Sequence, residues 1–297
     1  MSGDEGLLSE RARSSRVRSW LAKYLVVRLI LLAGAMLGVL IALQVGVHAL
    51  AHAVPVRAKT GVLVTAELAA CAVMILAYRF GVRFLERRLA TEIAFSRGAW
   101  LSLPGALLGV AIFSVVYAIL WVTGFAHYDG LGQWAGVAAV AASALAAAVG
   151  EEIVFRGALF RMIDERLGST AATLISAAIF GLLHALNPGA TLVSTIAIAL
   201  EAGVLLAAAY AAARTLWLPI GIHFGWNFTE GGVFGAAVSG GRSKSLLVFP
   251  LRGPDIYTGG AFGPEASVWA VAVCLAASAL IIWAALRLGR WRPFRGG

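Results

Sequence analysis

Val149-Gly150-Glu151-Glu152-Ile153-Val154-Phe155-Arg156 places two carboxylates and a guanidinium inside a long apolar run. Glu152 and Arg156 stand four residues apart, and on a helix this spacing puts both side chains on one face. Charged groups are costly inside a membrane, so such a pair within a membrane helix is a functional hypothesis by default. The stretch therefore predicts a membrane helix that turns a polar face toward the interior of a bundle.

Two further motifs repeat this spacing in the apolar segments that follow. They are Phe180-Gly181-Leu182-Leu183-His184 and His223-Phe224-Gly225-Trp226-Asn227. Gly168 lies midway along the sequence between Glu152 and His184, so two helices packed antiparallel about that glycine would bring the carboxylate and the imidazole level. Carboxylate, imidazole, guanidinium and amide groups on adjacent helices form a set suited to activating water.

The composition limits the class of protein. The chain has 297 residues, of which 60% are hydrophobic and only 13% are charged, far from the balance of a soluble domain. Apolar stretches of about twenty residues follow one another, which predicts an all-α polytopic membrane protein. The net charge of +9 does not indicate nucleic-acid binding, because the Lys and Arg residues cluster in short loops and tails beside the apolar spans.

We predict about eight membrane spans, with both termini in the cytoplasm. Their ranges are 25–47, 61–78, 100–122, 134–166, 170–186, 190–213, 216–230 and 267–287. The positive-inside rule sets the orientation, because the loop after the second span is rich in Arg and the loop over 123–133 has no Lys or Arg. The exceptions are Arg57 and Lys59 after the first span, and Arg242, Lys244 and Arg252 in a long loop.

The chain divides into three predicted parts. Residues 1–133 hold a basic N-terminal segment and three spans, residues 134–230 hold the motif-bearing spans, and residues 231–297 hold a loop, the last span and a basic tail. The loop over 231–266 is rich in Gly, Ser and Pro, which indicates irregular structure. It either covers a site or merely connects two spans, and we favour the plain connection.

Each motif also has a structural interpretation. Glu152 and Arg156 would be well placed for an ion pair that ties helices together, and a lone buried histidine is more often a satisfied core residue than a catalyst. Such a pair leaves Glu151 unexplained, and three such motifs in neighbouring spans favour a shared site over structure alone. Glu201 lies in a span flanked by the motif helices, and the sequence leaves open whether it faces the same interior.

The order EExxxR, FxxxH, HxxxN over successive spans resembles the CPBP intramembrane protease family, which includes the Rce1-type CaaX prenyl endopeptidases and bacterial Abi-type proteins. The resemblance covers residues 134–230 and implies an Rce1-like helical core. It implies that Glu151 is the general base that activates water, with His184 beside it. It further implies that His223 and Asn227 hold the oxyanion, and that Glu152 and Arg156 orient Glu151.

The predicted function is an intramembrane endopeptidase that cuts a membrane-embedded or membrane-anchored peptide near the cytoplasmic face of a bacterial cytoplasmic membrane. The alternatives are a non-catalytic immunity or scaffold protein on the same fold and, with less support, a proton-coupled transporter. Two histidines and a glutamate form a known zinc set, so Glu151, His184 and His223 are the ligands if a metal is present. No HExxH pattern occurs, and we favour water activated without a metal.

Overall fold

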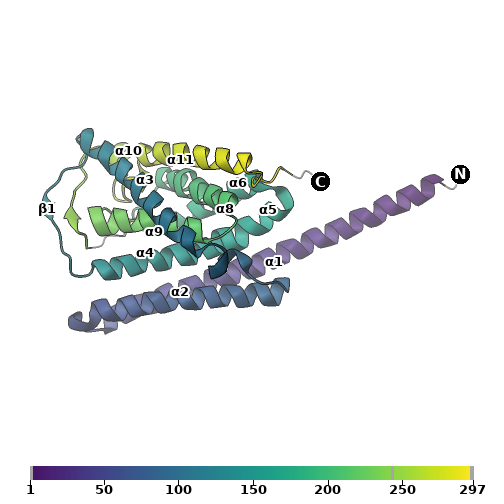
Figure 1. The fold of residues 1–297 in the computed structure, drawn as a ribbon, viewed down its shortest axis with the longest axis horizontal. Helices are drawn as coiled ribbons and strands as arrows, with labels where there is room; N and C mark the ends of the chain where they lie inside the picture. The colour runs from purple at the N-terminus through teal and green to yellow at the C-terminus, as the bar shows by residue number, and fades with distance from the viewer. Residues whose placement is uncertain (1–2, 242–243, 295–297) are drawn as a thin grey trace.

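The computed structural model describes the backbone of residues 3–241 and 244–294, and side chains from residue 24 onward except Val56. The chain forms a helical bundle with one small antiparallel sheet (Figure 1). The predicted all-α class is confirmed.

The first part of the chain forms three long helices and three short 3-10 turns. These are α1 (Gly3–Ala53), α2 (Val56–Glu86), three short 3-10 turns η1 (Thr91–Ile93), η2 (Phe95–Arg97) and η3 (Ala99–Leu101), and α3 (Ser102–Val122). The motif-bearing part follows a short strand, β1 (Gly130–Leu131). It comprises α4 (Val137–Glu152), η4 (Ile153–Phe160), α5 (Arg161–Leu167), α6 (Ser169–His184), α7 (Leu192–Ile198), η5 (Ala199–Gly203), α8 (Val204–Ala213), α9 (Trp217–Asn227) and η6 (Phe228–Phe234).

The remaining elements close the fold. They are β2 (Leu247–Val248), α10 (Asp255–Thr258), η7 (Pro264–Ala266) and α11 (Val268–Arg287). β1 pairs with β2, with Gly130 opposite Val248 and Leu131 opposite Leu247. The loop over 231–266 therefore contains ordered elements.

The bundle has two distinct ends. Both termini lie at the same end as α5, whereas β1 and α10 lie at the other end (Figure 1). We call these the termini end and the sheet end. The C-terminal tail is fixed at the termini end, where Arg290 Nη1 donates to the carbonyl oxygen of Ala212 at 2.7 Å and Arg292 pairs with Asp164 at 3.0 Å.

Six helical segments are long and apolar enough to cross a membrane: Tyr24–Ala53, Arg57–Glu86, Ala99–Val122, Val137–Leu167, Leu192–Ala213 and Val268–Arg287. The helix Ser169–His184 is apolar but shorter. The chain is thus a multi-pass membrane protein, whereas the count of eight spans and the cytoplasmic termini stay predictions.

Backbone contact between α3 and α9 positions the third motif. A Cβ atom at Gly225 would lie 2.1 Å from the carbonyl oxygen of Ala106, and one at Gly109 would lie 2.2 Å from that of Ile222. Only glycine permits helices to approach this closely, and small residues at helix interfaces are typical of membrane bundles. Because Gly225 lies between His223 and Asn227, this contact sets the depth and rotation of both side chains.

Three π-helical segments adjoin the predicted site residues. η4 begins directly after Glu152 and contains Arg156, η5 contains Glu201, and η6 begins directly after Asn227. Such segments are rare in proteins and occur frequently at functional sites.

Candidate active site

Glu152 and Arg156 form a fully buried ion pair at the centre of the bundle. Arg156 Nη1 donates to Glu152 Oε1 at 2.9 Å, and neither side chain is exposed. Arg156 Nη2 donates to the carbonyl oxygens of Ala202 at 3.2 Å and Gly203 at 3.0 Å. The guanidinium therefore joins η4 to η5, as expected for a buried charge that needs several partners.

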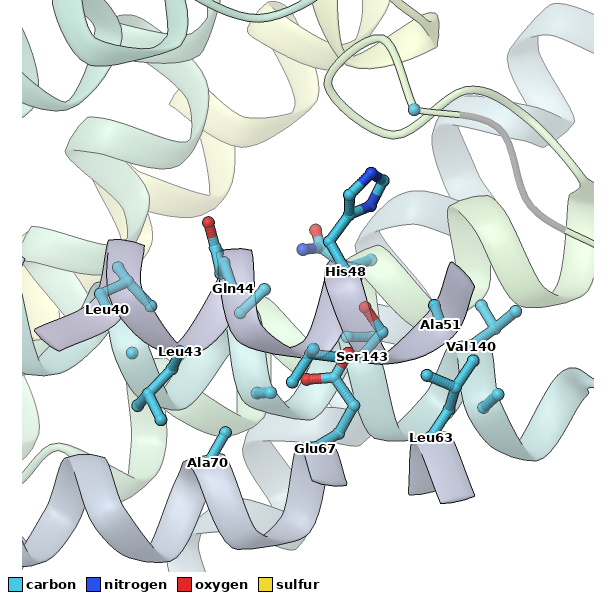
Figure 2. Close-up of a pocket in the computed structure, with 18 of the residues that line it drawn as sticks. Leu40, Leu43, Gln44, His48, Ala51, Leu63, Glu67, Ala70, Val140 and Ser143 are labelled. Atoms are coloured by element: carbon cyan, nitrogen blue, oxygen red, sulfur yellow. The ribbon is translucent and has the colours of Figure 1, made fainter. Parts of the chain in front are cut away.

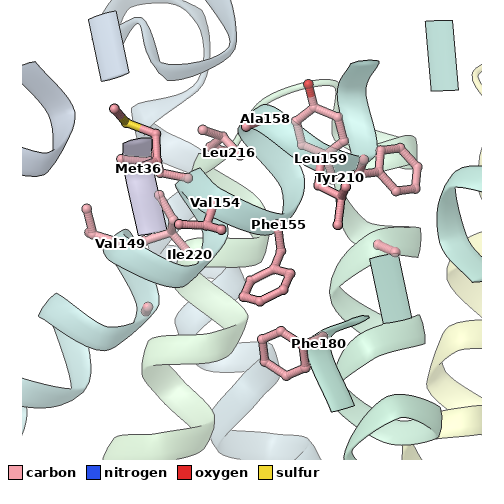
Figure 3. Close-up of a cluster of buried hydrophobic side chains, with 14 of the residues drawn as sticks. Met36, Val149, Val154, Phe155, Ala158, Leu159, Phe180, Tyr210, Leu216 and Ile220 are labelled. Atoms are coloured by element: carbon pink, nitrogen blue, oxygen red, sulfur yellow. The ribbon is translucent and has the colours of Figure 1, made fainter. Parts of the chain in front are cut away.

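Phe180 of the second motif packs against the same guanidinium. The Arg156 Cζ atom lies 4.9 Å from the centre of the Phe180 ring, within the range of a cation–π interaction. Phe155 and Phe180 meet edge to face with ring centroids 4.8 Å apart (Figure 3). The Phe180 ring also lies 4.5 Å from that of His184 and 6.4 Å from that of His223. Phe180 thus contacts the buried cation and lies beside both imidazoles.

His223 in α9 connects both glutamates of the first motif. Its Nδ1 lies 3.0 Å from Glu152 Oε1, and its Nε2 lies 3.9 Å from Glu151 Oε2. A carboxylate accepts hydrogen bonds only, so Nδ1 is the donor toward Glu152. The side chain of Glu151 is 19% exposed, and its Oε2 is buried without a hydrogen-bond partner.

His184 ends α6 with one ring nitrogen occupied. Its Nδ1 lies 2.8 Å from the carbonyl oxygen of Phe180. Because a carbonyl accepts, Nδ1 carries a proton, so Nε2 is the unprotonated nitrogen in the neutral form of the ring. That nitrogen is available as an acceptor.

A cavity of about 190 Å³ brings the motifs together. Glu151, His184, His223 and Asn227 all line it, whereas Glu152 and Arg156 lie outside the lining. A water molecule occupies about 30 Å³ in the liquid, so the space accommodates a peptide group and water. All three motifs thus converge, while the individual roles assigned to their residues stay predictions.

The long loop does more than connect two spans, contrary to the sequence expectation. Its residues Val238, Ser239 and Glu265 line the cavity. Ser239 donates from its backbone N–H and its hydroxyl to Glu265 Oε1, at 2.6 and 2.7 Å. Burial raises the pKa of the Glu265 carboxyl above its ordinary value. This contact ties together the two parts of the loop that line the cavity.

Sequence reasoning missed a second group of acids beside the motifs. Glu201 and Glu265 both line the cavity, and Glu230 lies behind it, where Trp226 Nε1 donates to its Oε2 at 3.0 Å. Glu201 is buried, and the thiol of Cys274 contacts its Oε2 at 3.4 Å. The sequence left the orientation of Glu201 open, and the structure turns it toward the site. Glu230 follows Asn227 by three residues, and this helical spacing could have predicted that it lies near the site. No local pattern marks Glu265.

The predicted metal ligands are Glu151, His184 and His223. Among the described residues, no group of three or more His, Cys, Asp or Glu side chains is arranged to hold an ion. His184 and His223 each place Nδ1 on a protein oxygen, which leaves Nε2 of both rings free, an arrangement that metal-bound histidines also show. Zinc binding by Glu151, His184 and His223 stays a prediction, and no chemical step below depends on a metal.

Residues 132–229 match the family model described as type II CAAX prenyl endopeptidase Rce1-like. Over this segment, the chain is similar to the Rce1-like family. The segment contains α4 to α9 and all six predicted site residues, and the match confirms the resemblance inferred from the motifs. The match supports an intramembrane protease of the CAAX type as the class of function. The chain matches no curated protein and no solved structure.

Proposed function

We propose that this protein is an intramembrane endopeptidase of a bacterial cytoplasmic membrane that hydrolyses a peptide bond with water activated by Glu151 and His184. One observation carries the proposal: the unpartnered Glu151 Oε2 and the ring of His184 border the same small cavity, at its junction with His223 and Asn227. A buried carboxylate oxygen without a partner costs free energy. A bound water or substrate group would remove that cost.

The first step is attack of water on the scissile carbonyl. A water between Glu151 Oε2 and His184 Nε2 gives one proton to the carboxylate while its oxygen bonds to the carbonyl carbon. The carbonyl oxygen becomes an oxyanion. When the C–N bond breaks, the proton passes to the departing amine, so Glu151 returns to its starting state. A positioned base of this kind contributes typically 10²- to 10⁴-fold to the rate.

His223 and Asn227 are the groups placed to stabilise the oxyanion. With Nδ1 donating to Glu152, Nε2 lies on the side of Glu151, and in the protonated form of the ring it carries an N–H donor as well. The Asn227 amide supplies a second N–H donor from the next turn of the same helix. Donors fixed in advance toward the developing charge usually give the largest single catalytic effect.

Glu152 and Arg156 set the orientation of this donor. Glu152 Oε1 accepts from both Arg156 Nη1 and His223 Nδ1, so one oxygen links the buried cation to the imidazole. Because both side chains are fully buried and the guanidinium is held by two backbone carbonyl oxygens, the His223 ring has little freedom to rotate.

The test is cleavage of membrane-anchored reporter peptides by the purified chain in detergent, with products identified by mass spectrometry. Glu151→Gln and His184→Gln keep the shape of each side chain and should each lower the rate about 10²- to 10⁴-fold. Glu165→Gln is the matched control, because its side chain is 46% exposed at the termini end and lies away from the cavity. Thermal unfolding of each variant separates lost chemistry from lost folding.

The outcomes decide the proposal. Cleavage by the wild type and Glu165→Gln, with loss in both site variants, supports it. Equal cleavage by Glu151→Gln and the wild type would refute the role of Glu151. Cleavage that stops on addition of a zinc chelator and returns with zinc would show that the metal-free mechanism is wrong.

A further inference from the structure

The two ends of the bundle differ sharply in charge. At the termini end, basic side chains lie in the last turn of α2 and after it, end α5 and α11, and occupy the turn before α9; they are Arg83, Arg87, Arg88, Arg97, Arg166, Arg214, Arg287, Arg290 and Arg292. At the sheet end, the described basic residues are fewer: Arg57, Lys59, Lys244 and Arg252. Loops rich in Lys and Arg stay in the cytoplasm. The termini end is therefore the cytoplasmic one.

The candidate active site lies toward the sheet end. His184 is the last residue of α6, at the sheet end of that helix, and Asn187 follows it into the cavity lining. The other lining residues outside the helices are Val238, Ser239 and Glu265, all from the loop that carries β2 and α10. No lining residue comes from η1, η2, η3, α5 or the C-terminal tail of the described chain.

A second, larger cavity of about 540 Å³ adjoins the first. It lies between α1, α2 and α4, and Figure 2 shows Gln44, His48, Glu67 and Ser143 facing it. Both cavities are lined by Ala147, Asn227 and Val238, so they adjoin. Along α1 the lining runs from Leu40 to Ala51, which is the half of the helix nearer the sheet end.

The route to the termini end is filled by packed side chains. Phe160 and Tyr210 meet edge to face at 5.4 Å, and Ala158 and Ala207 beside them are fully buried. In Figure 3, Ala158 and Tyr210 lie on the Leu216 side of Phe155 and Phe180, and Leu216 is the residue at the turn before α9. Interiors packed at this density leave no passage for a peptide.

We propose that the cavity is reached from the extracytoplasmic side, so that the substrate is a membrane-anchored polypeptide whose cut segment lies in the outer half of the bilayer. That a polypeptide substrate enters the cavity rests on the proposed peptidase function. The side of the membrane from which the cavity is reached does not depend on that function. It replaces the sequence expectation of a bond near the cytoplasmic face. A CAAX tail on a cytoplasmic protein would approach the closed end of the bundle.

Cysteine labelling tests the sidedness without any need for cleavage. The native Cys71 and Cys274 are buried, so the wild type is the blank. Full-length Asn187→Cys reports the cavity, Asp129→Cys the sheet end and Ser96→Cys the termini end, where both of the latter positions are exposed. Each is treated with a membrane-impermeant maleimide in right-side-out and in inside-out membrane vesicles.

Asn187→Cys and Asp129→Cys should label in right-side-out vesicles and Ser96→Cys only in inside-out vesicles. The reverse pattern would overturn the orientation. Labelling of Asp129→Cys together with a complete lack of label at Asn187→Cys in right-side-out vesicles would overturn the opening of the cavity to that side.

A pair of reporters then separates this inference from the proposed function. The same cleavable segment is placed next to a single membrane span, once on the extracytoplasmic side and once on the cytoplasmic side. Cleavage of the extracytoplasmic reporter alone supports both conclusions. Cleavage of the cytoplasmic reporter alone refutes the sidedness and keeps the peptidase. If neither reporter is cut while the labelling is as expected, the peptidase proposal fails and the sidedness stands.

Discussion

Two buried ionic clusters lie in the same bundle, and they are built differently. The site cluster consists of Glu151, Glu152, Arg156 and His223, on α4, η4 and α9. The end cluster consists of Tyr78, Glu86, Arg88, Glu92 and Arg161, where α2 and η1 meet η4 and α5.

The end cluster is saturated with hydrogen bonds. Arg88 donates to both oxygens of Glu92 at 2.8 Å, and Arg161 pairs with Glu86 and donates to the carbonyl oxygen of Gly157 at 2.8 Å. In the site cluster, by contrast, Glu151 Oε2, Glu152 Oε2 and Arg156 Nε are buried without a hydrogen-bond partner. Such atoms are rare in proteins because each costs free energy.

The difference separates a structural cluster from a chemical one. A network whose acceptors are all filled can hold elements together but cannot take a proton from water. The site cluster has a carboxylate oxygen without a hydrogen-bond donor beside a cavity, and general base catalysis requires such an oxygen. The two clusters contain similar numbers of acidic and basic side chains. They therefore differ in whether their carboxylate oxygens lack hydrogen-bond donors, and not in the presence of charge.

The largest expected effect comes from removing the cation of each cluster. Arg156→Met leaves the charge of Glu152 buried and should lower the free energy of unfolding by about 3–5 kcal/mol. Arg88→Met is the matched variant, and its loss should cost less, because Glu92 keeps its contacts with Arg161 and Tyr78. Denaturant titration in detergent measures both. Equal losses would mean that burial does not distinguish the clusters.

An intermediate effect is expected where the two clusters meet. The Tyr78 hydroxyl contacts both Glu92 and, at 2.7 Å, the carbonyl oxygen of Gly157, the residue after Arg156. Tyr78→Phe should cost about 1–3 kcal/mol of stability, because buried acceptors lose a donor. Tyr117→Phe, which loses a longer bond of 3.2 Å to Phe249, is the control and should cost less.

Cleavage rates of these two variants then sharpen the comparison. If the site cluster is held by its own contacts, Tyr78→Phe cleaves as fast per folded molecule as the wild type. A lower rate for Tyr78→Phe but not for Tyr117→Phe would show that the end cluster positions the site.

The smallest effect is a dependence on pH. Burial by itself raises the pKa of Glu92, but hydrogen bonds from Arg88 and Tyr78 and the charge of Arg161 outweigh it and lower the pKa below the ordinary 4.5. Because the pKa of Glu92 is lower in the folded state than in the unfolded state, its carboxylate stabilises the protein at pH values above the unfolded-state pKa. This stability is lost as the pH falls from about 4.5 through the folded-state pKa. Thermal unfolding from pH 7 to pH 3 should therefore show a steeper acid loss for the wild type than for Glu92→Gln. A parallel decline would assign the acid loss to other groups, and Glu165→Gln should behave as the wild type.

Much of the site was predictable because burying charged side chains in a membrane costs free energy. Glu152, Arg156 and His223 stand out in apolar sequence, and their four-residue spacing fixes which of them share a helix face. Ser239 and Glu265 were not predictable, because they are 26 residues apart in a Gly-rich loop with no periodicity. The loop therefore looked like a connection until its fold brought Ser239 and Glu265 to the cavity. The π-helical segments have no simple sequence signature either.

The sequence by itself determined an all-α membrane protein, the three motifs and the face of each helix that carries them, since local spacing and the cost of burying charge are properties of the chain alone. It also determined the orientation expected from the basic loops. Only the tertiary structure decided that Glu151 keeps an unpaired oxygen, that Glu201 and Glu265 join the cavity, and that the cavity faces the sheet end. Those properties depend on which groups from distant segments meet, and contacts between distant segments are fixed by packing, which no local pattern encodes.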